Sequence, residues 1–66
     1  MERQEKKVDL LEVVKMLSRK ELANILKVST RTIDRYRDQG MPYYRCNWRG
    51  LIGFELEEVK AWLRGE

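Results

Sequence analysis

The 66-residue sequence predicts a small, mainly α-helical domain with one β-hairpin. Three observations support this fold class. Two short segments within residues 18–40 each begin at a serine that can cap a helix. A glycine and then a proline, Gly40 and Pro42, end the second segment. In residues 43–54, aromatic and arginine side chains alternate loosely around a turn, which is typical of a hairpin. At this length residues 1–66 are expected to form a single domain.

Residues 1–17 predict an additional helix, running roughly from Glu5 to Leu17. Apolar residues recur there at spacings of three and four, as on the buried face of an amphipathic helix. The apolar stripe is broad. This helix is therefore expected either to pack on the domain or to offer a surface to a protein partner.

Residues 18–40 predict two short helices joined by a turn. Ser18 and Glu21 have the spacing of a capping box, so the first helix is expected from about Arg19 to Leu26. Ser29 can cap a second helix, from about Thr30 to Gln39, and the glycine that follows supplies a left-handed stop. Two short helices joined by three or four residues form a helix-turn-helix unit.

The remaining residues predict a hairpin over 43–54 and a closing helix over 55–64. The proline before residue 43 prevents any continuation of the preceding helix. In the last segment Leu56, Val59 and Leu63 follow helical spacing, and acidic residues occupy the first turn, as the helix dipole favours.

Composition excludes several classes of function. The chain has one cysteine and no histidine, so neither a disulfide nor a structural zinc site is expected. No signal peptide and no membrane-spanning run are recognisable, which makes a cytoplasmic location and no membrane partner the expectation. No paired carboxylates, phosphate loop or activated nucleophile can be identified. We therefore expect neither an enzyme nor a bound cofactor.

Positive charge is concentrated in residues 29–53, which hold five arginines and two aspartates. Arginine has a planar fork that matches phosphates and the edges of guanine. The alternative interpretation is an ordinary solvated surface. Charge alone therefore favours a nucleic-acid partner without deciding the matter.

The second helix of the pair carries the strongest functional signal. If Ile33 and Tyr36 face inward, then Arg31, Asp34, Arg35 and Asp38 lie near the opposite face. Thr30, Thr32 and Arg37 then lie on the flanks. In a helix-turn-helix, the outward face of this helix enters the major groove. The alternative is a mixed-charge face stabilised by pairs such as Arg31–Asp34; Asp34 could also orient Arg31 or accept from a cytosine.

The hairpin tip gathers a second set of candidate residues, Arg45, Asn47, Trp48 and Arg49. An arginine here can enter a narrow minor groove, where the negative potential is enhanced. Trp48 either stacks on a base or sugar, or folds back over the core.

The stretch from Leu17 to Leu63 resembles the excisionase-type, MerR-like winged helix-turn-helix family. Ser18–Ala23 matches the opening helix of that family, Leu26–Ile33 its turn and recognition-helix start, and Gln39–Pro42 its glycine-to-proline exit. Phe54, Val59, Ala61, Trp62 and Leu63 match its closing pattern. The run from Arg31 to Pro42 is also similar to the DNA-binding domain of phage terminase small subunits. Lys27 departs from the pattern, since the family usually has glycine there.

The resemblance implies groove contacts by Thr30, Arg31, Thr32 and Arg35, and a wing at Arg45–Arg49 against the adjacent minor groove. The full set of candidate DNA-binding residues is Ser29, Thr30, Arg31, Thr32, Arg35, Arg37, Arg45, Asn47, Trp48 and Arg49. The expected function is duplex DNA binding, as an excisionase-like architectural or regulatory factor of a phage or mobile element.

Two alternatives remain open at the level of sequence. One is single-strand binding, with Trp48 and Tyr44 as stacking platforms. The other is a protein-interaction adaptor that works with a replication, recombination or DNA-packaging enzyme through the N-terminal helix. Because one small module makes few contacts, tight binding is expected to require either several copies on adjacent DNA sites or a protein partner bound through the N-terminal helix.

Overall fold

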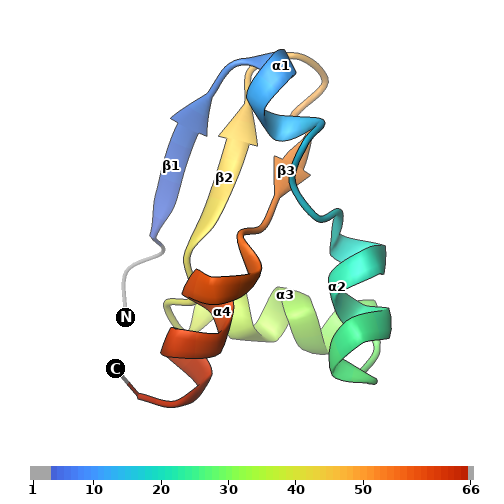
Figure 1. The fold of residues 1–66 in the computed structure, drawn as a ribbon, viewed down its shortest axis with the longest axis vertical. Coiled ribbons are helices and arrows are strands. Elements are labelled where there is room, and N and C mark those ends of the chain that lie inside the picture. The colour runs from blue at the N-terminus through green and yellow to red at the C-terminus, as the bar shows by residue number, and fades with distance from the viewer. Residues whose placement is uncertain (1–3, 66) are drawn as a thin grey trace.

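The computed structural model describes residues 4–65, which form four helices and a three-stranded mixed sheet (Figure 1). The chain is mainly helical, and the four helices and the hairpin agree with the predicted fold class at this level. In chain order the elements are β1 (Glu5–Val8), α1 (Leu10–Val13), α2 (Arg19–Leu26), α3 (Thr30–Asp38), β2 (Tyr43–Cys46), β3 (Ile52–Gly53) and α4 (Leu56–Leu63).

The sheet has the order β1-β2-β3 and contains both kinds of pairing. β1 runs parallel to β2, with Glu5 opposite Tyr43 and Lys7 opposite Arg45. β2 and β3 form the antiparallel hairpin that the sequence predicted. Three helices separate β1 from its partner strand in the chain, so this parallel pair is a long-range contact. Figure 1 shows the strands along the upper part of the molecule and α3 across its lower end.

The predicted N-terminal helix from Glu5 to Leu17 is wrong. Its first part is the strand β1, and only the four residues of α1 are helical. Asp9 separates the two, because its side chain accepts from the backbone N–H of Glu12 (3.1 Å) and so caps α1. The cap fixes the start of the helix at Leu10. The residues before it pair with β2, which no pattern near residue 5 could indicate.

The pair α2 and α3 agrees closely with the predicted bounds. Ser18 and Glu21 form the capping box, and the Ser29 side chain caps α3 by accepting from the N–H of Thr32. The connection between the helices is three residues long. Lys27 within it is left-handed, with φ 60° and ψ 43°. Left-handed backbone disfavours a residue with a Cβ, which explains why glycine would suit this position.

The core forms where α2, α3, α4 and the sheet meet. Its largest fully buried side chains are Tyr43, Phe54, Leu22, Ile33, Met41 and Val59. Phe54 exchanges two backbone hydrogen bonds with Leu17, and this isolated bridge ties the segment before α2 to the end of β3. Tyr36 and Trp62 join α3 to α4 through a ring contact of 5.5 Å.

The two faces of the sheet have different neighbours. One face is covered by α1 and α4: Val13 and Met16 lie over Gly53, where a Cβ would come within 2.8 Å of the Met16 Cβ. On the same face Tyr44 donates to Glu58 of α4. The other face carries Tyr43, whose ring lies against Arg37 of α3. The sheet therefore has an α1/α4 side and an α3 side. No helix among residues 4–65 is long and apolar enough to cross a membrane.

Replacing Lys27 with glycine should stabilise the domain by about 0.5–1 kcal/mol, because glycine adopts the left-handed conformation without the Cβ penalty. The matched control is Lys20→Gly, an exposed lysine inside α2, which should destabilise by about 1 kcal/mol. Urea unfolding measures both. Equal losses in the two variants would contradict the strain assigned to Lys27.

Candidate nucleic-acid interface

The outward face of α3 presents two arginines one helical turn apart. Ile33 is fully buried, which sets the opposite side of the helix toward solvent, and Arg31 and Arg35 are exposed there. Neither guanidinium makes an ion pair or hydrogen bond with any of residues 4–65. The prediction that this face points outward is confirmed.

The hydroxyl groups at the start of α3 serve the helix itself. Ser29 Oγ lies 3.2 Å from the backbone nitrogen of Thr32 and 3.1 Å from Thr32 Oγ1. Thr30 is partly buried at the first position of the helix. Ser29 is therefore primarily a capping residue, and its exposed position leaves the first turn of α3 accessible.

Asp34 does not pair with Arg31, contrary to one of the alternatives suggested by the sequence. Its carboxylate accepts two bonds from Arg19 of α2, at 3.2 and 3.0 Å, and one from Arg37, at 3.3 Å. Arg19 comes from the neighbouring helix and reaches the carboxylate from the side. The negative charge of Asp34 is thus neutralised by two cations other than Arg31.

Arg37 is packed into the domain. Only 13% of its side chain is exposed, and its guanidinium carbon lies 4.4 Å from the centre of the Tyr43 ring. Its Nε is buried without a hydrogen-bond partner within the described chain. These contacts hold α3 against the sheet. Arg37 therefore differs from Arg31 and Arg35, which have their guanidinium groups free.

Arg45 lies on the α3 side of the sheet, beside an acidic residue. The carboxylate of Glu5 accepts from the hydroxyl of Tyr43 at 2.9 Å and from Arg45 at 3.3 Å. The Tyr43 hydroxyl bond, helped by Arg45, lowers the pKa of the Glu5 carboxyl below its ordinary value. About half of the Arg45 side chain remains exposed.

Lys7 is a candidate that the sequence did not reveal. It pairs in register with Arg45, and the two side chains line one open hollow with Glu5, Asn47 and Gly50. The adjacent Lys6 points to the other side of the sheet, where it meets Glu58 at 3.6 Å and the ring of Tyr44. Side chains alternate between the two faces of a strand, so Lys6 and Lys7 point to opposite faces of the sheet. This difference could be recognised only once residues 5–8 were known to form a strand.

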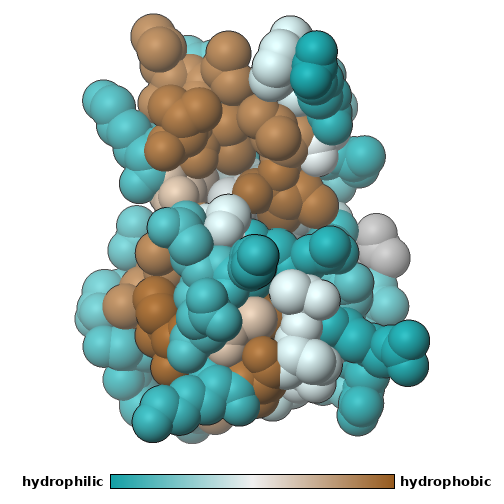
Figure 2. Space-filling model, turned by 90° about the vertical axis from the view of Figure 1, so that its right-hand side faces the viewer, coloured by the Kyte–Doolittle hydropathy of each residue, from teal (hydrophilic) through white to brown (hydrophobic). Residues whose placement is uncertain are grey.

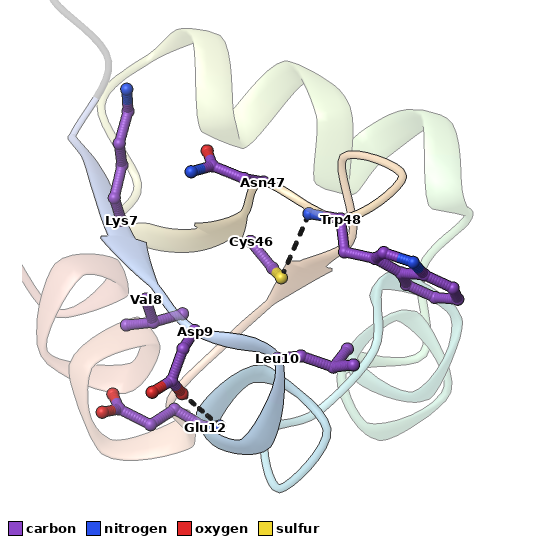
Figure 3. Close-up of a pocket in the computed structure, with 8 residues that line it drawn as sticks. All are labelled: Lys7, Val8, Asp9, Leu10, Glu12, Cys46, Asn47 and Trp48. Atoms are coloured by element: carbon purple, nitrogen blue, oxygen red, sulfur yellow. Dashed lines mark hydrogen bonds between the residues drawn. The ribbon is translucent and has the colours of Figure 1, made fainter.

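The residues of the hairpin tip divide into two groups. Asn47 and Lys7 point away from α1, whereas the ring of Trp48 lies on the side of Leu10 (Figure 3). Trp48 is 50% exposed, and the guanidinium of Arg49 stacks on it with 4.5 Å between the carbon and the ring centre. The alternative in which Trp48 folds back over the core is therefore not what is observed. Arg49 is left-handed, with φ 55°, in the turn that closes the hairpin.

The other chemistry-bearing groups form no site within residues 4–65. Cys46 is a buried free thiol whose sulfur accepts from the backbone N–H of Trp48 at 3.3 Å. No group of three metal-ligating side chains is found in this part of the chain. Tyr44 donates to Glu58, and this bond raises the pKa of the Tyr44 hydroxyl above its ordinary value.

Comparison with known proteins gives no further assignment: no protein-family model, no curated protein and no solved structure matches this chain.

Stability should fall in acid partly through Glu5. A carboxyl whose pKa is lowered in the folded state stabilises the fold above its unfolded pKa, and this contribution is lost as the pH falls through the folded pKa. The melting temperature of the wild type should therefore exceed that of Glu5→Gln at pH 6, and the gap should narrow as the pH falls below the ordinary glutamate pKa of about 4.3.

Tyr43→Phe is the matched control for this titration, since it removes the first hydrogen bond to the Glu5 carboxylate while keeping the ring. When Glu5→Gln is introduced into the Tyr43→Phe variant, it should lower the melting temperature at pH 6 by less than it does in the wild type. A gap that stays constant from pH 6 to pH 3 would contradict the assigned cause.

Proposed function

We propose that the chain binds double-stranded DNA without catalysis, as a winged helix-turn-helix module with α3 as its recognition helix. The observation that carries this proposal is the pair Arg31 and Arg35, exposed on one face of α3 without partners among residues 4–65. An arginine held by a carboxylate must break that ion pair before it binds a phosphate or guanine. Because Asp34 is occupied by Arg19 and Arg37, the two outward arginines avoid that cost.

We propose that basic side chains on the α3 side of the sheet add to the surface of α3. We use the name basic face for Arg31, Arg35, Lys7, Arg45 and Asn47. Arg37 links its two parts, because it belongs to α3 and packs on Tyr43 at the start of β2. The Glu5 carboxylate accepts hydrogen bonds from both Tyr43 and Arg45, and so connects the start of β2 to Arg45. Lysine and arginine at these positions can neutralise phosphates on either side of a groove.

The dimensions of the molecule suit one turn of DNA. Its longest extent is 29 Å, and Figure 1 places α3 and the hairpin tip at opposite ends of that axis. One turn of the duplex is about 34–36 Å. A duplex lying along the long axis can therefore meet α3 in its major groove and the hairpin residues Arg45 and Asn47 in the adjacent minor groove. Within this class, an architectural or regulatory factor resembling excisionases is the function we propose.

Single-strand binding is the second candidate, and the exposed ring of Trp48 favours it. An indole half exposed to solvent and flanked by an arginine is a platform on which a base can stack. The hollow that Trp48 lines also includes Lys7 and Asn47 of the basic face, but the indole ring itself lies on the side of Leu10, away from both of these side chains. The duplex proposal is preferred for that reason.

Removing the two outward arginines should weaken duplex binding at least about tenfold. Each arginine can make phosphate or base-edge contacts that contribute about 1–3 kcal/mol. Each lost phosphate contact also lowers the salt slope of the binding constant by about 0.9. Fluorescence anisotropy with labelled duplex across a salt series compares wild type with the double variant Arg31→Ala/Arg35→Ala.

The charge-matched control is Lys15→Ala/Lys60→Ala, two exposed lysines outside the basic face. It should keep most of the affinity. The same series with a single-stranded oligonucleotide and Trp48→Ala tests the second candidate. Wild-type protein that binds neither nucleic acid at low salt would refute both candidates.

Of the two neighbouring lysines of β1, only Lys7 should contribute to duplex binding. Lys7→Ala should weaken duplex binding a few-fold and lower the salt slope by about 1, since Lys7 shares the basic face with Arg45. Lys6→Ala changes the net charge equally but removes a residue held on the α4 side by Glu58. It should leave the slope nearly unchanged. Equal effects of the two substitutions would show that only net charge matters.

A further inference from the structure

A patch of apolar side chains lies at the end of the molecule opposite α3. We use the name end patch for five exposed hydrophobic residues of α1, its C-terminal cap and the hairpin loop: Leu10, Leu11, Val14, Trp48 and Leu51. Leu11 is 73% exposed and Val14 61%. Figure 2 shows apolar surface across the upper half of this side of the molecule, above the polar surface of the lower half.

The end patch is one surface built from two parts of the chain. Trp48 and Leu10 line the same open hollow (Figure 3). Leu51 lines a second hollow with Val13, Val14 and Met16. A contiguous apolar surface on a small domain marks an interaction site more often than isolated exposed residues do. Only Val13 of the four residues in α1 is buried, so this helix presents more apolar surface to solvent than to its own core.

Charges of both signs border the end patch. On the α1 side Asp9 and Glu12 line the hollow beside Leu10. On the hairpin side the guanidinium group of Arg49 stacks on the ring of Trp48. Neither the Glu12 carboxylate nor the Arg49 guanidinium has an ion-pair partner among residues 4–65. Each copy thus carries an acidic rim and a basic rim on either side of one apolar patch.

We propose that the end patch is a two-fold interface between two copies of this chain. In a two-fold interface the same surface of each copy meets its equivalent, so a residue on one rim faces the residue of the other rim on the second copy. The acidic rim at Glu12 then meets Arg49 of the second copy, twice in the dimer. A surface that pairs with its own copy through charges must carry both signs, and the end patch does.

The dimer is weak and leaves Arg31 and Arg35, the α3 part of the basic face, free. The patch consists of five side chains of a small domain, so weak association with dissociation in the micromolar range is expected. Both α3 helices remain exposed, because they lie at the far ends of the two copies (Figure 1). The proposal does not depend on DNA binding, and its test uses protein alone.

Sedimentation equilibrium of the full chain, from about 1 μM to about 1 mM, measures the association. The wild type should shift from monomer to dimer across this range. Leu11→Glu should raise the dissociation constant at least about tenfold. Leu63→Glu, at an exposed leucine of α4 outside the patch, should leave it unchanged. Circular dichroism checks that each variant folds.

An exchange of charges identifies the two-fold pairing itself. Glu12→Arg and Arg49→Glu should each weaken self-association, because both rims then carry the same sign. An equimolar mixture of the two variants should associate again, since each pairing in the mixed dimer joins opposite charges. A wild type that stays monomeric, equal effects of Leu11→Glu and Leu63→Glu, or a mixture that does not recover would overturn the proposal.

Discussion

Tyr43 is the residue on which the arrangement of the molecule depends. It is fully buried at the start of β2, and it contacts both α3 and β1. Its ring holds Arg37 of α3, its hydroxyl binds Glu5 of β1, and its backbone nitrogen donates to Gln4. These contacts fix how α3 stands relative to the sheet. Together with the buried core, they set the position of Arg45 relative to Arg31 and Arg35.

Some arginines form ion pairs with carboxylates of the domain, and others keep their guanidinium groups free at the surface. Asp34 holds Arg19 and Arg37, and Glu5 holds Arg45 loosely at the surface. Arg31 and Arg35 are left without a carboxylate within the described chain. Surface ion pairs contribute little stability, so the main effect of this division is on where positive charge remains exposed. In the proposed DNA binding, the position of Asp34 decides which arginines are available to the nucleic acid.

The two proposed surfaces meet near the hairpin, and only the α3 part of the basic face lies toward the other end of the molecule. The basic face uses α3 and the side of the sheet with Lys7 and Arg45, whereas the end patch uses α1 and the side of the hairpin loop with Trp48. Alternation along the strands places neighbouring residues on different surfaces. A short hairpin thereby contributes to both surfaces, and a dimer formed through the end patch leaves Arg31 and Arg35 of α3 accessible.

Local signals in the sequence determined α2, α3 and their connection. Ser18 with Glu21 and Ser29 each cap a helix within three residues, so the information is contained in the segment itself. Asp9 with Glu12 has the same spacing and could have placed the start of α1 correctly. The tertiary structure alone decided that residues 5–8 form a strand, since their partner begins 38 residues further along the chain. It also decided which arginines are paired and which lysine joins Arg45, because these depend on elements brought together only by the folded core.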